Sequence, residues 1–563
     1  MTRRMCVAGI AVLIAACGAD ESAVDAPTVT EGDPVLESRD EAAATTDVPV
    51  RSWLIETAED LPLSAVREFT TAVISGELLI EPLFPGSPDL AGMYLIEAES
   101  AYGEREAFDI AYRLKDLPQV VDAVPNFATH EPDLPREASA ACLFSDSEGV
   151  PQQHDWSLKK MHVREAWELE PMSGGKRFGE GVTVCHPDSG WAEHLEYEAD
   201  AINKSLATDL IDEGGTGEDP LDYSGNPGHG TATGSVIASR GDDDTTEPPG
   251  GVFGIAPRAK VIPIRALKSV VHFLDSDVAR AVDYARAQSC DVVSMSLGGA
   301  GFFGLKKAIR KAVEDNDKIV VAAAGNCVGR VVAPAKYGTT IAAAASNWND
   351  VPWKGSSKGR AVTVTAPGEG IWVARRERGS TDTHKVDNSN GTSYATAAIA
   401  GAAADWIAFH GKERLNAAKG QHSLTALFRF VLQDAVNTPD GWDTGRYGPG
   451  ILDVEKLLQA DIDAFPKDQP RSAADADTPL STLSRTIDRS PRQTRDLLQF
   501  LFGTGDPDVL AGTYGAELER MAATRPADMQ RILDLVDQRA VRSEINEEIA
   551  GRFSTRLQKA VGQ

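Results

Sequence analysis

The chain of 563 residues has few basic residues, few cysteines and no long apolar run after its N-terminus. Its 84 acidic residues outnumber its 56 lysines and arginines, which gives a formal net charge of −28. Such a chain lacks the basic face that phosphate binding requires, so nucleic acid is excluded as the main partner. The longest apolar candidate, residues 397–409, carries Asp405 and is shorter than the roughly 18–20 residues of a spanning helix. A polytopic membrane protein is excluded as well.

Only six cysteines are present, and two of them lie before residue 18. The other four, Cys142, Cys185, Cys290 and Cys327, allow three complete pairings, and the sequence does not choose among them. Export would permit disulfides, but a cysteine in a core-like run usually behaves as a small hydrophobic residue. We therefore expect free, buried thiols at the three cysteines that lie in such runs.

The first 16 residues have the pattern of an export signal, with two arginines followed by ten apolar residues at 7–16. Ten residues are too few to cross a bilayer but fit a secretory signal. The small residues before Cys17 resemble a bacterial lipoprotein signal. The resemblance implies that Cys17 is acylated and becomes the mature N-terminus of a periplasmic or cell-surface lipoprotein, which meets the membrane only through its lipid. An ordinary cleaved signal, with Cys17 incidental, is the alternative.

Two regions precede the main part of the chain. Residues 17–50 contain nine acidic residues, one basic residue and almost no large apolar ones. Such a stretch cannot bury enough surface to offset its conformational entropy, so we expect a disordered tether. Residues 51–137 show a strand, a helix, two strands, a helix and a strand, and then a Pro-containing linker at 131–135. This order predicts a small α+β domain of the ferredoxin-like type.

The stretch 138–465 alternates short apolar strands with helices. Strands that are apolar on both faces predict an α/β domain, in which helices cover both faces of a parallel β-sheet. Residues 466–563 begin as a polar linker and continue as a small helical region. Near the end, apolar residues recur every four positions and predict one amphipathic helix, with Ser543 as its cap; they are Ile545, Ile549, Phe553, Leu557 and Val561.

Three segments place chemically active side chains at the ends of predicted elements. Asp188 ends an apolar strand, His229 lies in Gly-His-Gly-Thr at a helix start, and Ser393 lies in Gly-Thr-Ser at the start of an Ala-rich helix. Ligands of parallel sheets bind beyond the carboxyl ends of the strands, so we expect the three to meet there. Serine hydrolysis needs these groups, because the imidazole takes the hydroxyl proton and the carboxylate fixes the imidazole tautomer.

A fourth segment, Ala-Ala-Ala-Gly-Asn, leads from a strand into a turn at Asn326. We expect its side-chain amide to donate to an oxyanion together with the backbone N–H of Ser393. Each side chain has a simpler interpretation alone: His229 starts a helix, Asp188 and Asn326 shape turns, and Ser393 caps a helix. Their occurrence together favours catalysis.

These blocks resemble the subtilisin-like serine proteases, in which acid, histidine and serine follow in the same chain order. The match extends over about residues 51–460. The resemblance implies an exported serine endopeptidase made as a zymogen, with 51–137 as its inhibitory propeptide. It implies protein or peptide substrates and no cofactor for the chemistry. Candidate substrate-binding residues are Ser296, Leu297, Gly298, Gly299, Ala324 and Gly325.

The chain departs from the family pattern at several places, among them Tyr394, where Met is commoner, and Ala398, at the usual His. Ala397 stands where the family has proline after the nucleophile, and His186 precedes the acid where aliphatic residues are usual. The stretch between Asn326 and Pro334 is also short. We expect residues 330–332 to narrow the S1 pocket that receives the substrate side chain.

Two other functions stay open: a catalytically silent relative that binds peptides, and a transpeptidase or macrocyclase on the same fold. Calcium is a further candidate ligand at the acidic loop 242–244, as in loops of the family, but this loop lacks an ordered ligand pattern. No metal site is therefore predicted. Because the anchor at Cys17 lies on the tether, cleavage near 131–150 is expected to release the mature enzyme unless the propeptide stays docked.

Overall fold

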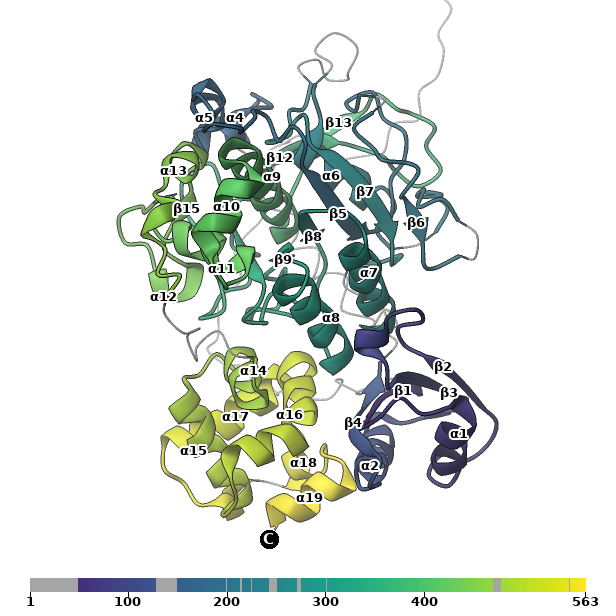
Figure 1. Ribbon diagram of the computed structural model, residues 1–563. Helices are drawn as coiled ribbons and strands as arrows, with labels where there is room; N and C mark the ends of the chain where they lie inside the picture. The colour runs from purple at the N-terminus through teal and green to yellow at the C-terminus, as the bar shows by residue number, and fades with distance from the viewer. Residues whose placement is uncertain are drawn as a thin grey trace, which may run out of the picture. The chain divides into compact units, whose positions relative to one another are not determined.

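Three parts follow one another along the chain in a computed structural model (Figure 1). The described residues are 49–127, 149–198, 200–212, 215–223, 225–241, 251–270, 275–299, 301–468, 477–545 and 547–562. All of them belong to the second of two units, which runs from Asp47 to Gln563. We call 49–127 the N-terminal domain, the described part of 149–468 the central domain, and the described part of 477–562 the C-terminal helical domain.

Several predictions fall outside the described residues. They concern the export signal, Cys17, the tether up to residue 48, Cys142 and the acidic loop 242–244. Among the helices of the described ranges, none has the length and apolar character that crossing a bilayer requires.

The N-terminal domain has the βαββαβ order that the sequence indicates. Its four antiparallel strands are arranged β2-β3-β1-β4. Trp53 of β1 is fully buried, and its indole N–H donates to the Ala107 carbonyl at 3.0 Å, which holds α2 on the sheet. The elements are β1 (Val50–Thr57), α1 (Leu63–Thr71), β2 (Leu78–Pro82), β3 (Met93–Tyr102), α2 (Glu104–Lys115) and β4 (Val120–Asn126).

A nine-stranded sheet forms the centre of the central domain, in the order β14-β15-β11-β10-β9-β8-β5-β7-β6. All pairs are parallel except β14 with β15. The α/β fold class is thereby confirmed. The strands are β5 (Thr183–Asp188), β6 (Thr208–Asp209), β7 (Lys260–Arg265), β8 (Val292–Met295), β9 (Ile319–Ala323), β10 (Ile341–Ser346), β11 (Val364–Pro367), β14 (Val436–Asn437) and β15 (Ile451–Leu452).

Helices cover both faces of this sheet (Figure 1). Successive residues of a strand enter different cores: Val292 packs with α6 (His229–Ala238) and α9 (Thr392–His410), whereas Val293 packs with α7 (Asp275–Ala287) and α8 (Phe303–Glu314). Every residue of the Ala-rich α9 is buried. Further elements are α4 (Trp156–Lys160), α5 (Val163–Glu168), β12 (Ile371–Ala374), β13 (Val386–Ser389), α10 (Lys412–Lys419), α11 (Leu424–Val431), α12 (Thr444–Tyr447) and α13 (Val454–Gln459).

The C-terminal helical domain has its own core, in which side chains from all of its longer helices meet. Ser490 and Gln493 form a reciprocal capping box at the start of α15, a contact worth about 1 kcal/mol. The helices are α14 (Pro479–Thr486), α15 (Pro491–Phe502), α16 (Pro507–Thr524), α17 (Pro526–Asp537), α18 (Glu547–Ala550) and α19 (Thr555–Gly562).

Two predictions were wrong. The single helix expected near the C-terminus is interrupted between α18 and α19, where Ser554 caps the second helix by accepting from the Leu557 N–H at 3.2 Å. The apolar residues that were expected on one side of that helix still pack in one core despite the break. The expected free thiols are also corrected: Cys185 and Cys290 form a disulfide between β5 and the segment before β8, and Cys327 is disulfide-bonded as well.

Candidate active site

The carboxyl ends of three adjacent strands bring the predicted residues together. Asp188 is the last residue of β5, Ser296 follows β8, and Asn326 lies three residues after β9. These strands are neighbours in the sheet and run parallel, so their ends lie at one edge. Helices α6 and α9 pack against each other and begin at His229 and just before Ser393.

Asp188 and His229 form a direct hydrogen bond. The Asp188 Oδ1 atom lies 2.8 Å from His229 Nδ1, and Asp188 is fully buried while the imidazole side chain is 11% exposed. Burial alone raises the pKa of Asp188, but the charge of His229 and this hydrogen bond outweigh it, so the pKa lies below its usual value. Asp188 is thus held as a carboxylate that orients the imidazole and leaves Nε2 for proton transfer.

A second histidine lies behind the carboxylate. His186 Nε2 is 3.6 Å from Asp188 Oδ2 and 2.9 Å from the Thr233 hydroxyl, which in turn donates to the His229 carbonyl at 2.9 Å. Burial lowers the pKa of His186 despite the nearby carboxylate, so the ring is neutral near pH 7. The Ser189 N–H also donates to Asp188 Oδ1 at 2.7 Å. These contacts fix the position of the carboxylate.

Glycine beside His229 is required by close backbone approach. A Cβ atom at Gly230 would lie 2.0 Å from the Gly190 carbonyl oxygen and 3.3 Å from the Asp188 Cβ. A Cβ atom at Gly228 would lie 2.2 Å from the Arg376 carbonyl oxygen, and Gly228 has a φ of +78°. Neither position has room for a methyl group. The first turn of α6 is therefore positioned by backbone packing.

Ser393 lies in the first turn of α9, 4% exposed. Its hydroxyl donates to the Ser296 carbonyl at 3.3 Å, and the Ser296 hydroxyl donates to the Ser393 carbonyl at 2.8 Å. The ring of the next residue, Tyr394, lies 6.4 Å from the His229 ring, centroid to centroid. Among the described residues, the Ser393 hydroxyl is hydrogen-bonded to the Ser296 carbonyl and not to His229. Catalytic hydrogen bonds often form only when substrate is bound.

Asn326 faces the start of α9. Its Oδ1 accepts from the Thr392 N–H at 2.9 Å and from the Thr392 hydroxyl at 2.8 Å. This fixes the amide so that Nδ2 points the other way, and a Cβ built on Gly391 would lie 3.4 Å from Nδ2 and 3.7 Å from the Ser393 Cβ. The amide nitrogen and the Ser393 side chain thus both lie around Gly391, on the side where an oxyanion donor is needed.

The candidate substrate-binding residues 296–299 lie in the segment after β8, and this segment is already hydrogen-bonded. The Gly298 N–H donates to the Val270 carbonyl at 3.0 Å, and Gly299 exchanges two hydrogen bonds with Ala333 at 2.9 and 3.0 Å. Leu297 is 1% exposed. An extended peptide that uses the Gly298 N–H must therefore replace the Val270 carbonyl.

Val332 occupies the space between two of the predicted substrate-binding glycines. A Cβ built on Gly298 would lie 2.3 Å from Val332 Cγ2, and one built on Gly325 would lie 3.1 Å from Val332 Cγ1. The Val332 N–H donates to the Ala324 carbonyl at 3.0 Å, which fixes this position. Little space remains between the two glycines for a large side chain.

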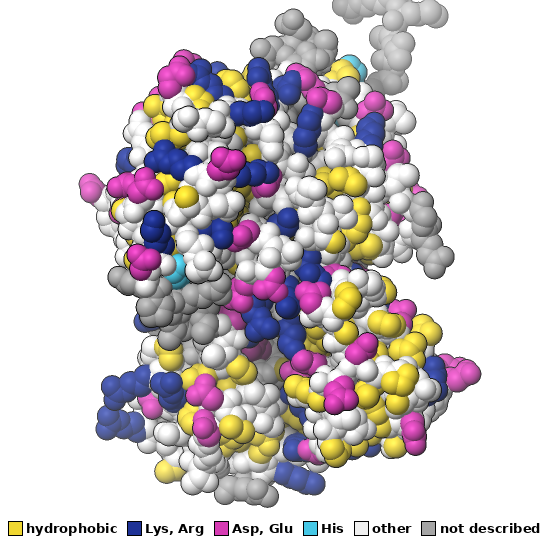
Figure 2. Space-filling model, viewed as in Figure 1, with side chains coloured by type: hydrophobic (Ala, Val, Ile, Leu, Met, Phe, Trp, Pro, Cys, Tyr) yellow, Lys and Arg dark blue, Asp and Glu magenta, His cyan; other side chains and the backbone are white. Residues whose placement is uncertain are grey.

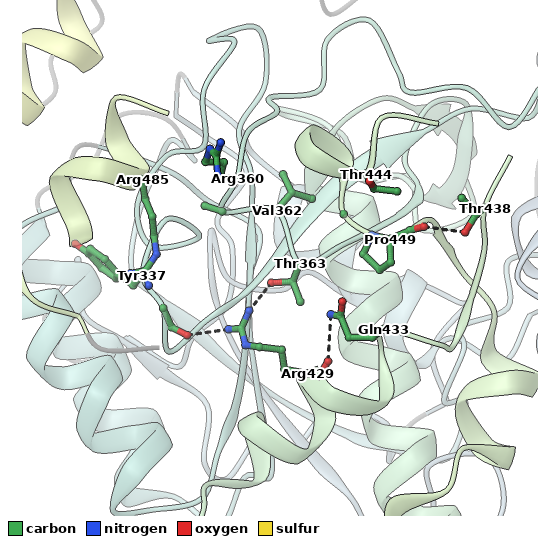
Figure 3. A pocket seen from close by; sticks show the side chains of 13 residues that line it. Tyr337, Arg360, Val362, Thr363, Arg429, Gln433, Thr438, Thr444, Pro449 and Arg485 are labelled. Atoms are coloured by element: carbon green, nitrogen blue, oxygen red, sulfur yellow. Dashed lines mark hydrogen bonds between the residues drawn. The ribbon is translucent and has the colours of Figure 1, made fainter. Parts of the chain in front are cut away.

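A separate cavity of about 460 Å³ contains none of these residues (Figure 3). It is lined in part by Arg360, Arg429 and Arg485. Arg429 donates to the Thr363 hydroxyl at 2.9 Å and to two backbone carbonyls, and Arg485 pairs with Asp477 at 2.8 Å. Two of the three guanidinium groups are thus bonded to the chain itself. No cluster of three metal-ligating side chains occurs in the described ranges.

Three residues that position the predicted ones were not predicted from the sequence: Thr233, Thr392 and Val270. Thr233 lies four residues after His229, which places it on the same side of a helix. Thr392 directly precedes Ser393 within its motif. Those two spacings were visible in the sequence. Val270 had no local signal, because its pairing with Gly298 joins segments that only the folded sheet brings together.

Comparison with known proteins places these observations in one family. The model of the family described as Subtilase family matches residues 179–442. Thermitase from Thermoactinomyces vulgaris is 31% identical over 255 residues, which cover 44% of this chain and 79% of thermitase. Subtilisin DY from Bacillus licheniformis is 32% identical over 238 residues, 41% of this chain and 78% of that protein.

A solved structure shares the fold. The crystal structure of fervidolysin from Fervidobacterium pennivorans, a keratinolytic enzyme related to subtilisin, superimposes with a TM-score of 0.53. It is 19% identical, and the match covers 74% of this chain and 62% of fervidolysin. At this identity the likeness concerns the fold alone.

Proposed function

The chain belongs to the subtilase family of serine endopeptidases, and on this premise we propose that it hydrolyses peptide bonds with Ser393 as nucleophile, His229 as general base and Asp188 as the group that orients His229. The observation that carries the proposal is the 2.8 Å contact between Asp188 Oδ1 and His229 Nδ1 at the edge of the sheet where α9 brings Ser393. Asn326 is proposed as an oxyanion donor.

The chemistry proceeds by acyl transfer. Ser393 Oγ bonds to the peptide carbonyl carbon as His229 Nε2 takes its proton, and the oxyanion accepts hydrogen bonds from Asn326 Nδ2 and the Ser393 N–H. The C–N bond then breaks, and His229 gives the proton to the leaving amine. Water attacks the acyl-enzyme in the reverse sense, which regenerates the Ser393 hydroxyl.

The N-terminal domain is proposed as an intramolecular inhibitor, which makes the protein a zymogen. It docks on α7 through polar pairs, in which Ser87 donates to Asp283 at 2.7 Å and Asp89 pairs with Arg286 at 2.8 Å. Glu56 pairs with Lys307 of α8. The Phe127 ring, at the end of the described part of this domain, lies 6.0 Å from the Phe302 ring. The chain thus approaches the central domain as it leaves the N-terminal domain.

Export is proposed on two grounds. The Cys185–Cys290 disulfide is typical of an oxidising compartment, and the first 17 residues resemble a lipoprotein signal. In this proposal Cys17 carries the lipid that anchors the chain, and no metal or organic cofactor takes part in the chemistry.

The substrate preference proposed is a small side chain at P1, the residue whose carbonyl is attacked. Val332 fills the space between Gly298 and Gly325, so a large P1 side chain would overlap with it. Replacing Val332 with Gly should shift the preference toward larger P1 residues by at least about tenfold in kcat/KM, measured on a peptide library. An unchanged P1 profile would refute this assignment.

A fluorophosphonate probe tests the nucleophile after the N-terminal domain has been removed. We expect Ser393 alone to be labelled, and labelling to be lost in His229→Ala. A protein that leaves Ser393 unlabelled would be a catalytically silent relative. Product masses separate hydrolysis from the transpeptidase alternative, because joined peptides have the mass of two substrates minus the leaving group.

A further inference from the structure

Helix α16 of the C-terminal helical domain contacts both other domains. Its Glu519 pairs with Lys336 of the central domain at 2.7 Å, and both side chains are largely buried. The next residue, Arg520, pairs with Glu104 of the N-terminal domain at 3.4 Å, and Arg525 pairs with the other oxygen of Glu104. One helix therefore joins the two domains through charged groups that are mostly withdrawn from water.

The centre of this contact is a buried hydrogen-bond network. The Glu517 carboxylate accepts from the Tyr112 hydroxyl at 2.8 Å and from the N–H and hydroxyl of Ser554 at 2.6 and 2.8 Å. Glu517 is 5% exposed and Tyr112 4%. Separating the domains breaks the Tyr112–Glu517 hydrogen bond, whereas the bonds from Ser554 to Glu517 stay within the C-terminal helical domain. A buried hydrogen bond that joins the two surfaces makes them specific for each other.

The N-terminal domain also completes the last helix of the chain. Asp109 of α2 accepts from the Thr555 N–H at 3.1 Å and from the Arg556 N–H at 3.0 Å. Both donors belong to the first turn of α19, whose N–H groups have no partner within the helix. A carboxylate at that position satisfies them and favours the helix dipole. This cap is supplied by a different domain.

The N-terminal domain also contacts the central domain. Its Ser87 and Asp89 pair with side chains of α7, and α8 contributes further pairs. Lys307 of α8 pairs with Glu56 of the N-terminal domain, and the preceding Lys306 donates to Thr482 of the C-terminal helical domain at 2.7 Å. Figure 2 shows Lys and Arg side chains gathered over α8, with Asp and Glu side chains beside them. The N-terminal domain is thus held by two separate surfaces of the remaining chain.

We propose that the C-terminal helical domain is a dedicated binding surface for the N-terminal domain and retains it on the central domain after the segment 128–148 has been cut. Two surfaces that bind the same partner act together, because the second contact forms at high effective concentration while the first holds. Dissociation then requires both to open at once.

Retention itself does not depend on catalysis, but its consequence rests on the proposed function. A retained N-terminal domain keeps the mature enzyme inhibited and joined to its proposed anchor at Cys17. Cleavage alone then does not release the active enzyme, and a second event must open the contact with α16 and α19.

The test uses the full chain with Ser393→Ala, so that no self-cleavage occurs, and a site-specific protease sequence inserted at the linker 131–135. After that protease has cut, the dissociation rate of the N-terminal fragment is measured by dilution and size-exclusion chromatography. We expect Glu104→Gln and Asp109→Asn each to dissociate at least tenfold faster than the unsubstituted chain.

The matched control is Glu106→Gln, on the same first turn of α2 but exposed to solvent. It should dissociate within about twofold of the unsubstituted chain, because an exposed charge contributes little. If the fragment leaves every variant at the same rate, or leaves the unsubstituted chain as soon as it is cut, the proposal is overturned.

Exchanging the charges of one ion pair distinguishes a lost contact from a variant that fails to fold. Arg556 pairs with Asp116 at the exposed margin of the contact. Arg556→Asp should speed dissociation and Asp116→Arg should do the same, whereas the double variant should restore a slower rate. A double variant as fast as the faster single one would show that the two residues do not meet in the cut protein, against the proposal.

Discussion

The active-site edge and the contact between α2 and α16 are held together by different means. At the edge, backbone atoms approach so closely that a methyl group at Gly230 would meet the Gly190 carbonyl at 2.0 Å. At the α2–α16 contact, charged side chains such as Glu104 and Arg520 make the connection. Backbone packing fixes catalytic groups within narrow limits. Paired side chains form a contact that can separate as a unit, as the proposed release of the N-terminal domain requires.

The largest loss of activity is expected at Asn326, which supplies a hydrogen-bond donor at the active-site edge of the sheet. Asn326→Asp keeps an oxygen for the Thr392 N–H and removes only the amide donors. Asn326→Leu removes both functions. We expect kcat to fall by about 10²–10³ in each variant with little change in KM, since the donor acts on the transition state. A loss confined to KM would assign Asn326 to substrate binding.

Backbone packing at the edge predicts a second difference between the two regions. Gly230→Ala should lower kcat by about 10²-fold, because the first turn of α6 must shift by an ångström or more and takes His229 with it. Gly515→Ala on α16 has no atom within 4 Å of the new Cβ and should leave activity unchanged. Its melting temperature should be equal or slightly higher, since Ala favours a helix. Equal activity of the Gly230→Ala and Gly515→Ala variants would contradict the claim that backbone packing positions the active site.

The smallest effect is a pH dependence of the α2–α16 contact. Burial raises the pKa of Glu517 to about 7. The groups that face it are Tyr112 and Asp109 on α2 and Ser554 before α19. A pKa raised in the docked state stabilises docking at low pH, and this contribution is lost as the pH rises through about 7.

Retention of the cut N-terminal fragment should therefore weaken by about tenfold between pH 5.5 and 8.5. Dissociation rates measured across this range should show the change, and Glu517→Gln should remove most of it. Tighter retention at pH 8.5, or the same slope in Glu517→Gln, would show that Glu517 does not control the contact.

The sequence predicted the active-site residues better than it predicted the contacts between domains. Asp188, His229 and Ser393 each lie in short segments whose glycines and small residues carry the signal locally. The α/β fold followed from strands that are apolar on both faces. The contacts that could not be predicted join segments far apart in the sequence. The Val270 carbonyl that accepts from the Gly298 N–H, for example, has no local pattern.

The disulfide and the C-terminal helix show the same limit. Cys185 and Cys290 are 105 residues apart, and only the pairing of β5 with β8 brings them together. Apolar spacing predicted which C-terminal residues share a core but not the break before Ser554. No local pattern marks Asp109 of α2 as a contact residue, because its partner Thr555 lies more than 400 positions further along the chain.

The most direct test of the catalytic assignment is the mass and N-terminal sequence of the purified chain with and without Ser393→Ala. Self-processing by Ser393, His229 and Asp188 predicts two fragments for the unsubstituted chain, cut within 128–148, and one uncut species for Ser393→Ala. An unsubstituted chain that stays whole, or a Ser393→Ala chain cut at the same position, would contradict it.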